Sequence, residues 1–119
     1  MKNVKDQVYA ALAEVCENAS DTYPSNWANL PAVQYAEEEN KVMERTDNQE
    51  QKAYVRFRID IWDGKSTSAE ALKIDDAISA LGLVRTACQD VADPSGLKHK
   101  MMRYEGIIDM HSDTVYWNL

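Results

Sequence analysis

The segment 54–62 alternates strictly between apolar and polar side chains, and this pattern constrains the fold more than any other feature of the chain. One set of alternate positions is apolar and the other is charged: Val55, Phe57, Ile59 and Ile61 against Arg56, Arg58 and Asp60. A period of two predicts a strand in a sheet that is packed on one face and wet on the other. Tyr54 and Trp62 lie at the two ends of the polar, solvent-exposed side. A polar face of this kind favours contact with other proteins over chemistry.

Length and charge exclude several classes of protein. With 119 residues, the chain has the size of one domain that can bury a single core. Its net charge of −7 lies mostly in residues 1–50, which hold four Lys/Arg against ten Asp/Glu, whereas residues 51–119 hold nine against ten. Because an acidic chain repels phosphate backbones, general nucleic-acid binding is disfavoured.

The sequence also indicates where the protein resides. No apolar run approaches the roughly 18 residues of a membrane span, and no signal peptide begins the chain. We therefore expect a protein made in the cytosol, or one assembled there into something larger. Cys16 and Cys88 are isolated in sequence, so both are expected to be buried, reduced thiols.

Two amphipathic helices are predicted. Asn3 can cap the first, which ends near residues 17–20 and whose apolar positions share one stripe: Val4, Val8, Ala11, Leu12 and Val15. The second covers residues 67–81, with Thr67 and Glu70 satisfying each other's free amides and Gly82 ending it. Its stripe is Ala71, Ile74, Ile78 and Leu81.

Strands are expected at 31–38, 54–62, 83–91, 98–109 and 114–117, and residues 21–27 form a packed loop. Residues 39–52 are almost wholly polar, and three interpretations stay open: a charged hairpin tip, a flexible arm, or a mobile loop without a role. This order predicts one α+β domain over 1–119, a two-layer sandwich with both helices on one face of a mostly antiparallel sheet of about four to five strands.

The sequence contains no catalytic constellation. Neither His99 nor His111 has a partner at metal-ligand spacing, so no metal, cofactor or catalytic residue is expected, and the protein is predicted not to be an enzyme. Asp109, His111 and Asp113 can meet as a base-like group, but local turn hydrogen bonding explains them better. The pair at 75–76 is expected to be solvated on the exposed side of its helix.

The chain resembles the tail-completion, or tail-terminator, proteins of long-tailed bacteriophages and prophages. The resemblance rests on the amphipathic first helix and on a few segments that span nearly the whole chain: Tyr23-Pro24, 30–35, 56–63, the Ala-rich helix with Gly82-Leu83, and 103–109. It implies a small α+β domain that forms a ring, typically hexameric, at the head-proximal end of the tail. It also implies two partners, the tail tube protein and the head connector or adaptor, with DNA only as passing cargo. Its location would be the host bacterial cytoplasm during assembly and then the neck and tail of the virion.

On this interpretation, the wet face and the polar arm meet neighbouring subunits or the tube lumen, where acidic groups prevent DNA from sticking. The candidate contact residues are charged and aromatic: Tyr54, Arg56, Arg58, Trp62, Glu44, Arg45, Trp27 and Trp117. Core packing is the alternative for each aromatic. Two other functions stay open, a head-completion or connector-adaptor protein, and a cytosolic small-molecule-binding α+β domain with a pocket on the sheet face opposite the helices.

Overall fold

A computed structural model describes residues 1–117 of the chain. The described residues form two helices, α1 (Lys5–Val15) and α2 (Ser68–Ser79). They also form six strands: β1 (Asn18–Ser20), β2 (Ala32–Thr46), β3 (Gln49–Asp63), β4 (Val84–Val91), β5 (Lys98–Asp109) and β6 (Thr114–Tyr116).

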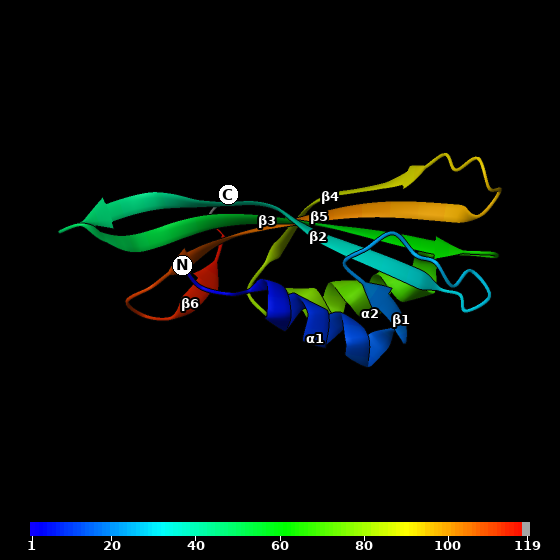
Figure 1. The fold of residues 1–119 in the computed structure, drawn as a ribbon, viewed down its shortest axis with the longest axis horizontal. Helices are drawn as coiled ribbons and strands as arrows, with labels where there is room; N and C mark the ends of the chain where they lie inside the picture. Colours follow the sequence, from blue (N-terminus) through cyan, green and yellow to red (C-terminus); the bar gives the residue numbers. More distant parts are fainter. Residues whose placement is uncertain (118–119) are drawn as a thin grey trace.

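The strands make one sheet in the order β1-β2-β3-β5-β4, with β6 paired to the end of β5. Every pairing is antiparallel except that of β1 with β2. Both helices lie on the same side of this sheet (Figure 1). The predicted α+β class is therefore confirmed. The sheet has one strand more than expected, because α1 ends at Val15 and Cys16 is already extended, which leaves residues 18–20 free to pair with β2.

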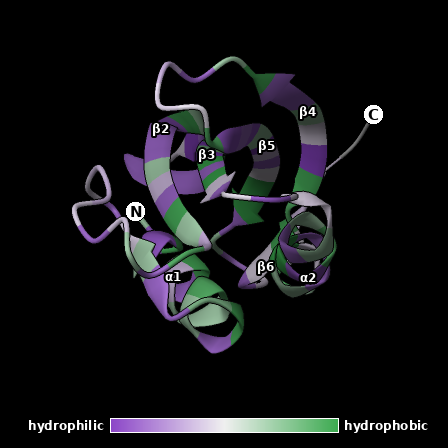
Figure 2. Cartoon of the chain, turned by 90° about the vertical axis from the view of Figure 1, so that its right-hand side faces the viewer, coloured by the Kyte–Doolittle hydropathy of each residue, from purple (hydrophilic) through white to green (hydrophobic). Residues whose placement is uncertain are grey.

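The alternation in β3 places its apolar side chains in the core, as predicted. Four of them are fully buried: Val55, Phe57, Ile59 and Ile61. They join one hydrophobic cluster with Val8 and Leu12 of α1 and Ile74 and Ile78 of α2. Figure 2, which looks along the sheet, shows α1 near the β1–β2 side and α2 near the β4 side.

The helix ends agree only partly with the predictions. The Asn3 side chain accepts a hydrogen bond from the backbone N–H of Asp6 at 3.2 Å, as expected for a cap. The predicted reciprocal cap between Thr67 and Glu70 does not form. Thr67 already has helical dihedral angles, and its side chain caps no amide. Ser66 takes this role, because its hydroxyl accepts from the N–H of Ser68 at 3.2 Å.

Gly82 follows α2 in the left-handed conformation, with φ of 94°. It is needed for a second reason that the sequence does not show. A Cβ at this position would lie 2.3 Å from the carbonyl oxygen of Val115. Gly82 therefore allows the end of α2 and β6 to approach each other closely.

Residues 39–52 form the end of a long hairpin. Of the three interpretations, the hairpin tip is therefore confirmed. β2 and β3 pair as far as Thr46 and Gln49, and the two-residue turn between them has positive φ at both Asp47 (53°) and Asn48 (61°). Positive φ at both turn residues matches the twist of the paired strands. The tip projects beyond the helices (Figure 1), in a molecule with extents of 52, 25 and 23 Å.

The two cysteines differ in environment. Cys16 is buried and free, as predicted, and burial raises the pKa of its thiol. The prediction is wrong for Cys88, which is exposed. Cys88 lies on β4, the edge strand of the sheet. Within residues 1–117, neither helix has the length and apolar character that crossing a membrane requires.

Candidate functional site

The sheet face opposite the helices, called here the outer face, carries a network of charged side chains at its centre. Cross-strand pairing sets Arg56 of β3 opposite Glu105 of β5, and Arg58 opposite Arg103. Glu38 of β2 links two of the arginines, since it accepts hydrogen bonds from Arg56 Nε at 3.2 Å and from Arg103 Nε at 2.9 Å. The outer face is therefore charged but internally neutralised.

The pKa values of Glu38 and Glu105 are both lowered by their neighbours on the outer face. Burial by itself raises the pKa of Glu38, but hydrogen bonds and charge from Arg103 and then Arg56 outweigh it, and the pKa is lowered. Burial likewise raises the pKa of Glu105, and it is outweighed by hydrogen bonds from Thr86 and Tyr54, so this pKa is also lowered. Both carboxylates are held in their charged form.

Tyr54 and Trp117 meet at one end of the network. The two ring centroids lie 5.9 Å apart, and the Tyr54 hydroxyl donates to Glu105. Burial, followed by the hydrogen bond to Glu105, raises the pKa of Tyr54. The indole Nε1 of Trp117 is buried and has no hydrogen-bond acceptor among residues 1–117. Four of the eight candidate residues, Tyr54, Arg56, Arg58 and Trp117, thus belong to one half-buried part of the outer face.

The other end of the outer face is buried. The prediction that Asp60 and Trp62 face solvent is therefore wrong. These residues are only 7% and 3% exposed. The loop before β2 folds over them, so that Tyr23 and Trp27 contact the Trp62 ring edge-on at 5.7 and 5.6 Å. Residues 21–27 form the expected loop, but it is packed only in part, because Trp27 is half-buried whereas Tyr23 is 64% exposed. Trp27 and Trp62 are therefore in contact with each other, and Trp62 anchors this fold instead of presenting a free surface.

His99 joins this buried end, and sequence reasoning missed it. Its ring stacks on Trp62 at 4.4 Å, its Nε2 lies 2.8 Å from Asp60 Oδ1, and its Nδ1 lies 3.6 Å from Asp93 Oδ2. Pairing the predicted strands 54–62 and 98–109 in antiparallel register would have found the contact, because His99 lies directly opposite Trp62.

A histidine between two carboxylates resembles a general base, but these carboxylates are already engaged. Asp60 also accepts two hydrogen bonds from Arg58, at 2.9 and 3.1 Å. Asp93 accepts from Trp62 Nε1 at 2.8 Å and from the Ser95 hydroxyl at 2.7 Å. Since every partner is an anchoring contact between loop, β3 and β5, the group stabilises the fold. Within the described residues, no three His, Cys, Asp or Glu side chains gather as metal ligands would.

Two other acidic positions are now placed. Asp109 accepts hydrogen bonds from the backbone N–H groups of His111 and Ser112, so local turn bonding explains that group, as expected. The prediction that Asp75 is solvated is wrong. Its carboxylate accepts from the Tyr104 hydroxyl at 2.6 Å, which ties α2 to the sheet.

The last two candidates, Glu44 and Arg45, lie at the hairpin tip, away from the other six. Glu44 Oε2 lies 3.9 Å from Lys52 Nζ, and Arg45 donates to the carbonyl oxygen of Asn48 at 3.0 Å. Val42 and Met43 beside them are 46% and 53% exposed. The tip therefore presents charged and apolar groups together.

Comparison with models of protein families finds no match to this chain, and comparison with curated proteins finds none either. Any inference about function therefore depends on the surfaces described above.

Proposed function

We propose that the chain is a non-enzymatic structural protein of a phage or prophage virion. It forms a ring at the head-proximal end of the tail and joins the tail tube to the head connector. It works in the host bacterial cytoplasm during assembly and then in the neck of the virion. The resemblance of its segments to tail-terminator proteins supports this assignment, as does the geometry of the sheet.

The observation that carries the proposal is the outer face with its projecting tip. Both helices cover the opposite face, so the half-exposed group around Tyr54, Arg56 and Arg58 is free to meet another protein. Its charges already pair with one another within the chain. The tip adds the exposed Val42 and Met43 at a distance from this group.

The two edges of the sheet are unlike, which suits a ring. Beyond its pairing with β1 at residues 32–34, the outer edge of β2 has no neighbouring strand within residues 1–117, and β4 has none on its far side. Unpaired edges accept further strands. Joining one edge to the different edge of the next copy is a heterologous contact, the kind that closes into a ring.

The alternatives differ in how well these surfaces suit them. A head-completion or connector-adaptor protein would use the same face and tip. A small-molecule-binding domain would need a pocket lined mainly by apolar groups. The hollow on the outer face, of about 380 Å³, has apolar as well as charged walls: Tyr23, Gln34, Ala36, Arg58, Asp60, Trp62 and His99. Its charged groups already bond to one another, since Asp60 accepts from Arg58 and lies 2.8 Å from His99 Nε2. They are therefore not free to orient a ligand, which favours the structural role.

The test is to measure assembly of the purified chain, alone and mixed with the tail tube protein of the same phage or prophage. We expect ring-sized particles, or rings on tube ends, by native mass spectrometry and negative-stain microscopy. Arg56→Glu should abolish them while the fold is kept, because Arg56 makes only partly exposed ion pairs with Glu38 and Glu39.

Lys73→Glu is the matched control, with the same change of charge on α2, where Lys73 is exposed and contacts only Glu70. It should assemble normally. A chain that stays monomeric in both settings, or a stable dimer that retains a metabolite, would overturn the proposal.

A further inference from the structure

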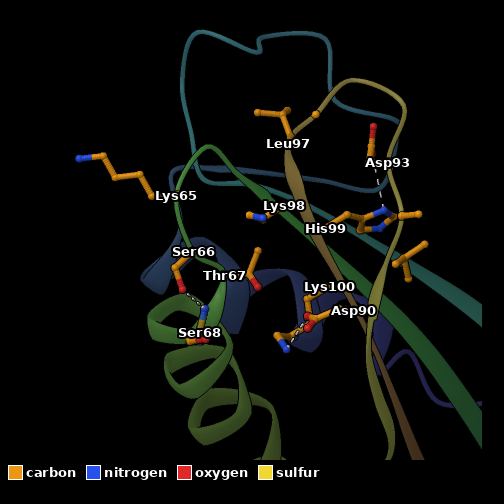
Figure 3. Close-up of a pocket in the computed structure, with 13 residues that line it drawn as sticks. Lys65, Ser66, Thr67, Ser68, Asp90, Asp93, Leu97, Lys98, His99 and Lys100 are labelled. Carbon is orange, nitrogen blue, oxygen red and sulfur yellow. Dashed lines mark hydrogen bonds and ion pairs between the residues drawn. The ribbon is translucent and has the colours of Figure 1, made fainter.

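A hollow of about 660 Å³ lies where the start of α2 meets the end of β4 and the start of β5 (Figure 3). This hollow is called here the α2 pocket. It opens beside the helix layer and borders the buried end of the outer face, since His99 lines both this hollow and the one on the outer face. Its polar lining consists mostly of lysines and hydroxyls: Lys65, Ser66, Thr67, Ser68, Lys98 and Lys100. Its volume falls within the range of roughly 300–1,000 Å³ that is usual for small-molecule sites.

Two lysines of the α2 pocket have no carboxylate within 4.0 Å among residues 1–117. Ten of the chain's 13 Lys and Arg side chains lie within 4.0 Å of a carboxylate of the described residues. The remaining three are Lys65, Lys98 and Arg45, and the first two line this pocket. In a chain with 20 acids, two unpaired cations at one hollow make a local positive site.

The start of α2 adds hydrogen-bond donors on the same side. The first N–H groups of a helix have no acceptor within it, and the helix dipole favours a negative group there. Ser66 caps only the N–H of Ser68.

The Thr67 side chain is the second, independent observation. The residue is only 5% exposed, yet its hydroxyl makes no hydrogen bond to any of residues 1–117, and it lines the pocket. In Figure 3, Thr67 stands between the helix start and the lysines of β5. The hydroxyl is not one of the fully buried polar atoms that lack a partner, so it reaches the pocket and can donate to a group bound there.

The acids in the wall do not cancel this charge. Asp90 accepts from Lys100 Nζ at 2.9 Å, so these two neutralise each other. Asp93 is held by Ser95, Trp62 and His99, and the Ser95 hydrogen bonds lower its pKa most. Lys65 and Lys98 therefore keep their charge available to a ligand.

We propose that the α2 pocket binds a phosphate group, either as free phosphate or as the monoester of a small molecule. The Thr67 hydroxyl and the first amides of α2 donate to its oxygens, while Lys65 and Lys98 neutralise it. For a monoester, Val91 and Leu97 in the wall offer apolar contact to the organic part. The residues proposed to bind the phosphate, Lys65, Thr67 and Lys98, are not among those proposed for ring assembly, so either proposal can fail without the other.

The test is to titrate the ¹⁵N-labelled full chain with inorganic phosphate, with glycerol 3-phosphate, and with sodium chloride at matched ionic strength. The amide chemical shifts report binding in each titration. We expect saturable shifts at residues 65–69 and 96–98 with the phosphates and not with chloride. Tighter binding of the ester would assign the site to a monoester, and equal or weaker binding would assign it to free phosphate. Shifts that do not saturate, or that chloride reproduces, would overturn the proposal.

Variants test the named donors. Lys65→Gln with Lys98→Gln should weaken binding about tenfold or more, and Thr67→Val about fivefold, as expected from the loss of charge-assisted and neutral hydrogen bonds. Arg45→Gln is the matched control, since it removes the third unpaired cation, at the hairpin tip, and should leave the affinity unchanged. Equal weakening in the control would show general charge attraction and overturn the proposal. The amide spectrum of each free variant reports whether it is folded, and the wild-type titration decides the outcome independently of them.

Discussion

The two ends of the β2–β3 hairpin share one backbone ladder but have opposite surroundings. At the base, residues 32–37 pair with 57–62, and the sheet is covered by the helices on one face and, around Trp62, by Tyr23 and Trp27 on the other. At the tip, residues 41–52 have neither cover, and most side chains there are exposed.

The difference teaches that strand pairing alone does not decide what a strand contributes. Apolar burial supplies most of the stability of a domain, so the base should carry the fold. The tip keeps its strands through backbone hydrogen bonds and cross-strand pairs, which leaves its side chains free for partners. Four predictions test this division, from the largest expected effect to the smallest.

Phe57→Ala should lower the free energy of unfolding by about 3–5 kcal/mol, because it opens a cavity in the fully buried base. Met43→Ala at the tip is the control and should change it by less than about 0.5 kcal/mol. Urea unfolding followed by circular dichroism measures both. Similar losses in the two variants would show that the tip is as much a part of the core as the base.

Arg58→Glu should lower the free energy of unfolding by about 2 kcal/mol, since it places a second carboxylate against the buried Asp60. Arg56→Glu, two residues nearer the tip, should lower it less, because the ion pairs of Arg56 are partly exposed. Thermal and urea unfolding distinguish them. If both variants were equally stable, the burial of the Asp60 carboxylate would not require its ion pair with Arg58.

Acid should weaken the fold through the centre of the outer face. The lowered pKa values of Glu38 and Glu105 mean that their contribution is complete above the unfolded pKa of glutamate, about 4.3, and is lost as the pH falls through the folded values. Unfolding free energies measured across this window should fall with pH, less steeply in Glu38→Gln. A slope that the variant leaves unchanged would rule out Glu38 as a contributor.

Asn48→Gly should strengthen the tip by about 0.5 kcal/mol, because glycine adopts positive φ without strain. Asn48→Val should have the opposite sign, since a β-branched residue is strained there. Hydrogen exchange of the amides in 41–52 would report both. Unchanged exchange in both variants would show that the turn does not control the order of the tip.

Part of the candidate site could be predicted, and the limit is physical. The spacing in 54–62 assigns Arg56 and Arg58 to the face away from the helices, because side chains of a strand alternate regardless of what surrounds it. Burial of Asp60, the contact of Trp27 with Trp62 and the position of His99 depend on a loop and a strand far along the chain. The free hydroxyl of Thr67 likewise depends on which neighbour caps α2, and both Ser66 and Thr67 have suitable side chains.

The sequence by itself determined the two helices, the inner face of β3 and the need for a glycine at position 82, since periodicity and backbone conformation are local properties. The tertiary structure alone decided which charges of the outer face are buried, and how far the hairpin extends as paired strands. It also placed Lys65 and Lys98 at the start of α2. Those outcomes depend on contacts between residues distant in sequence, whose free energies no local pattern records.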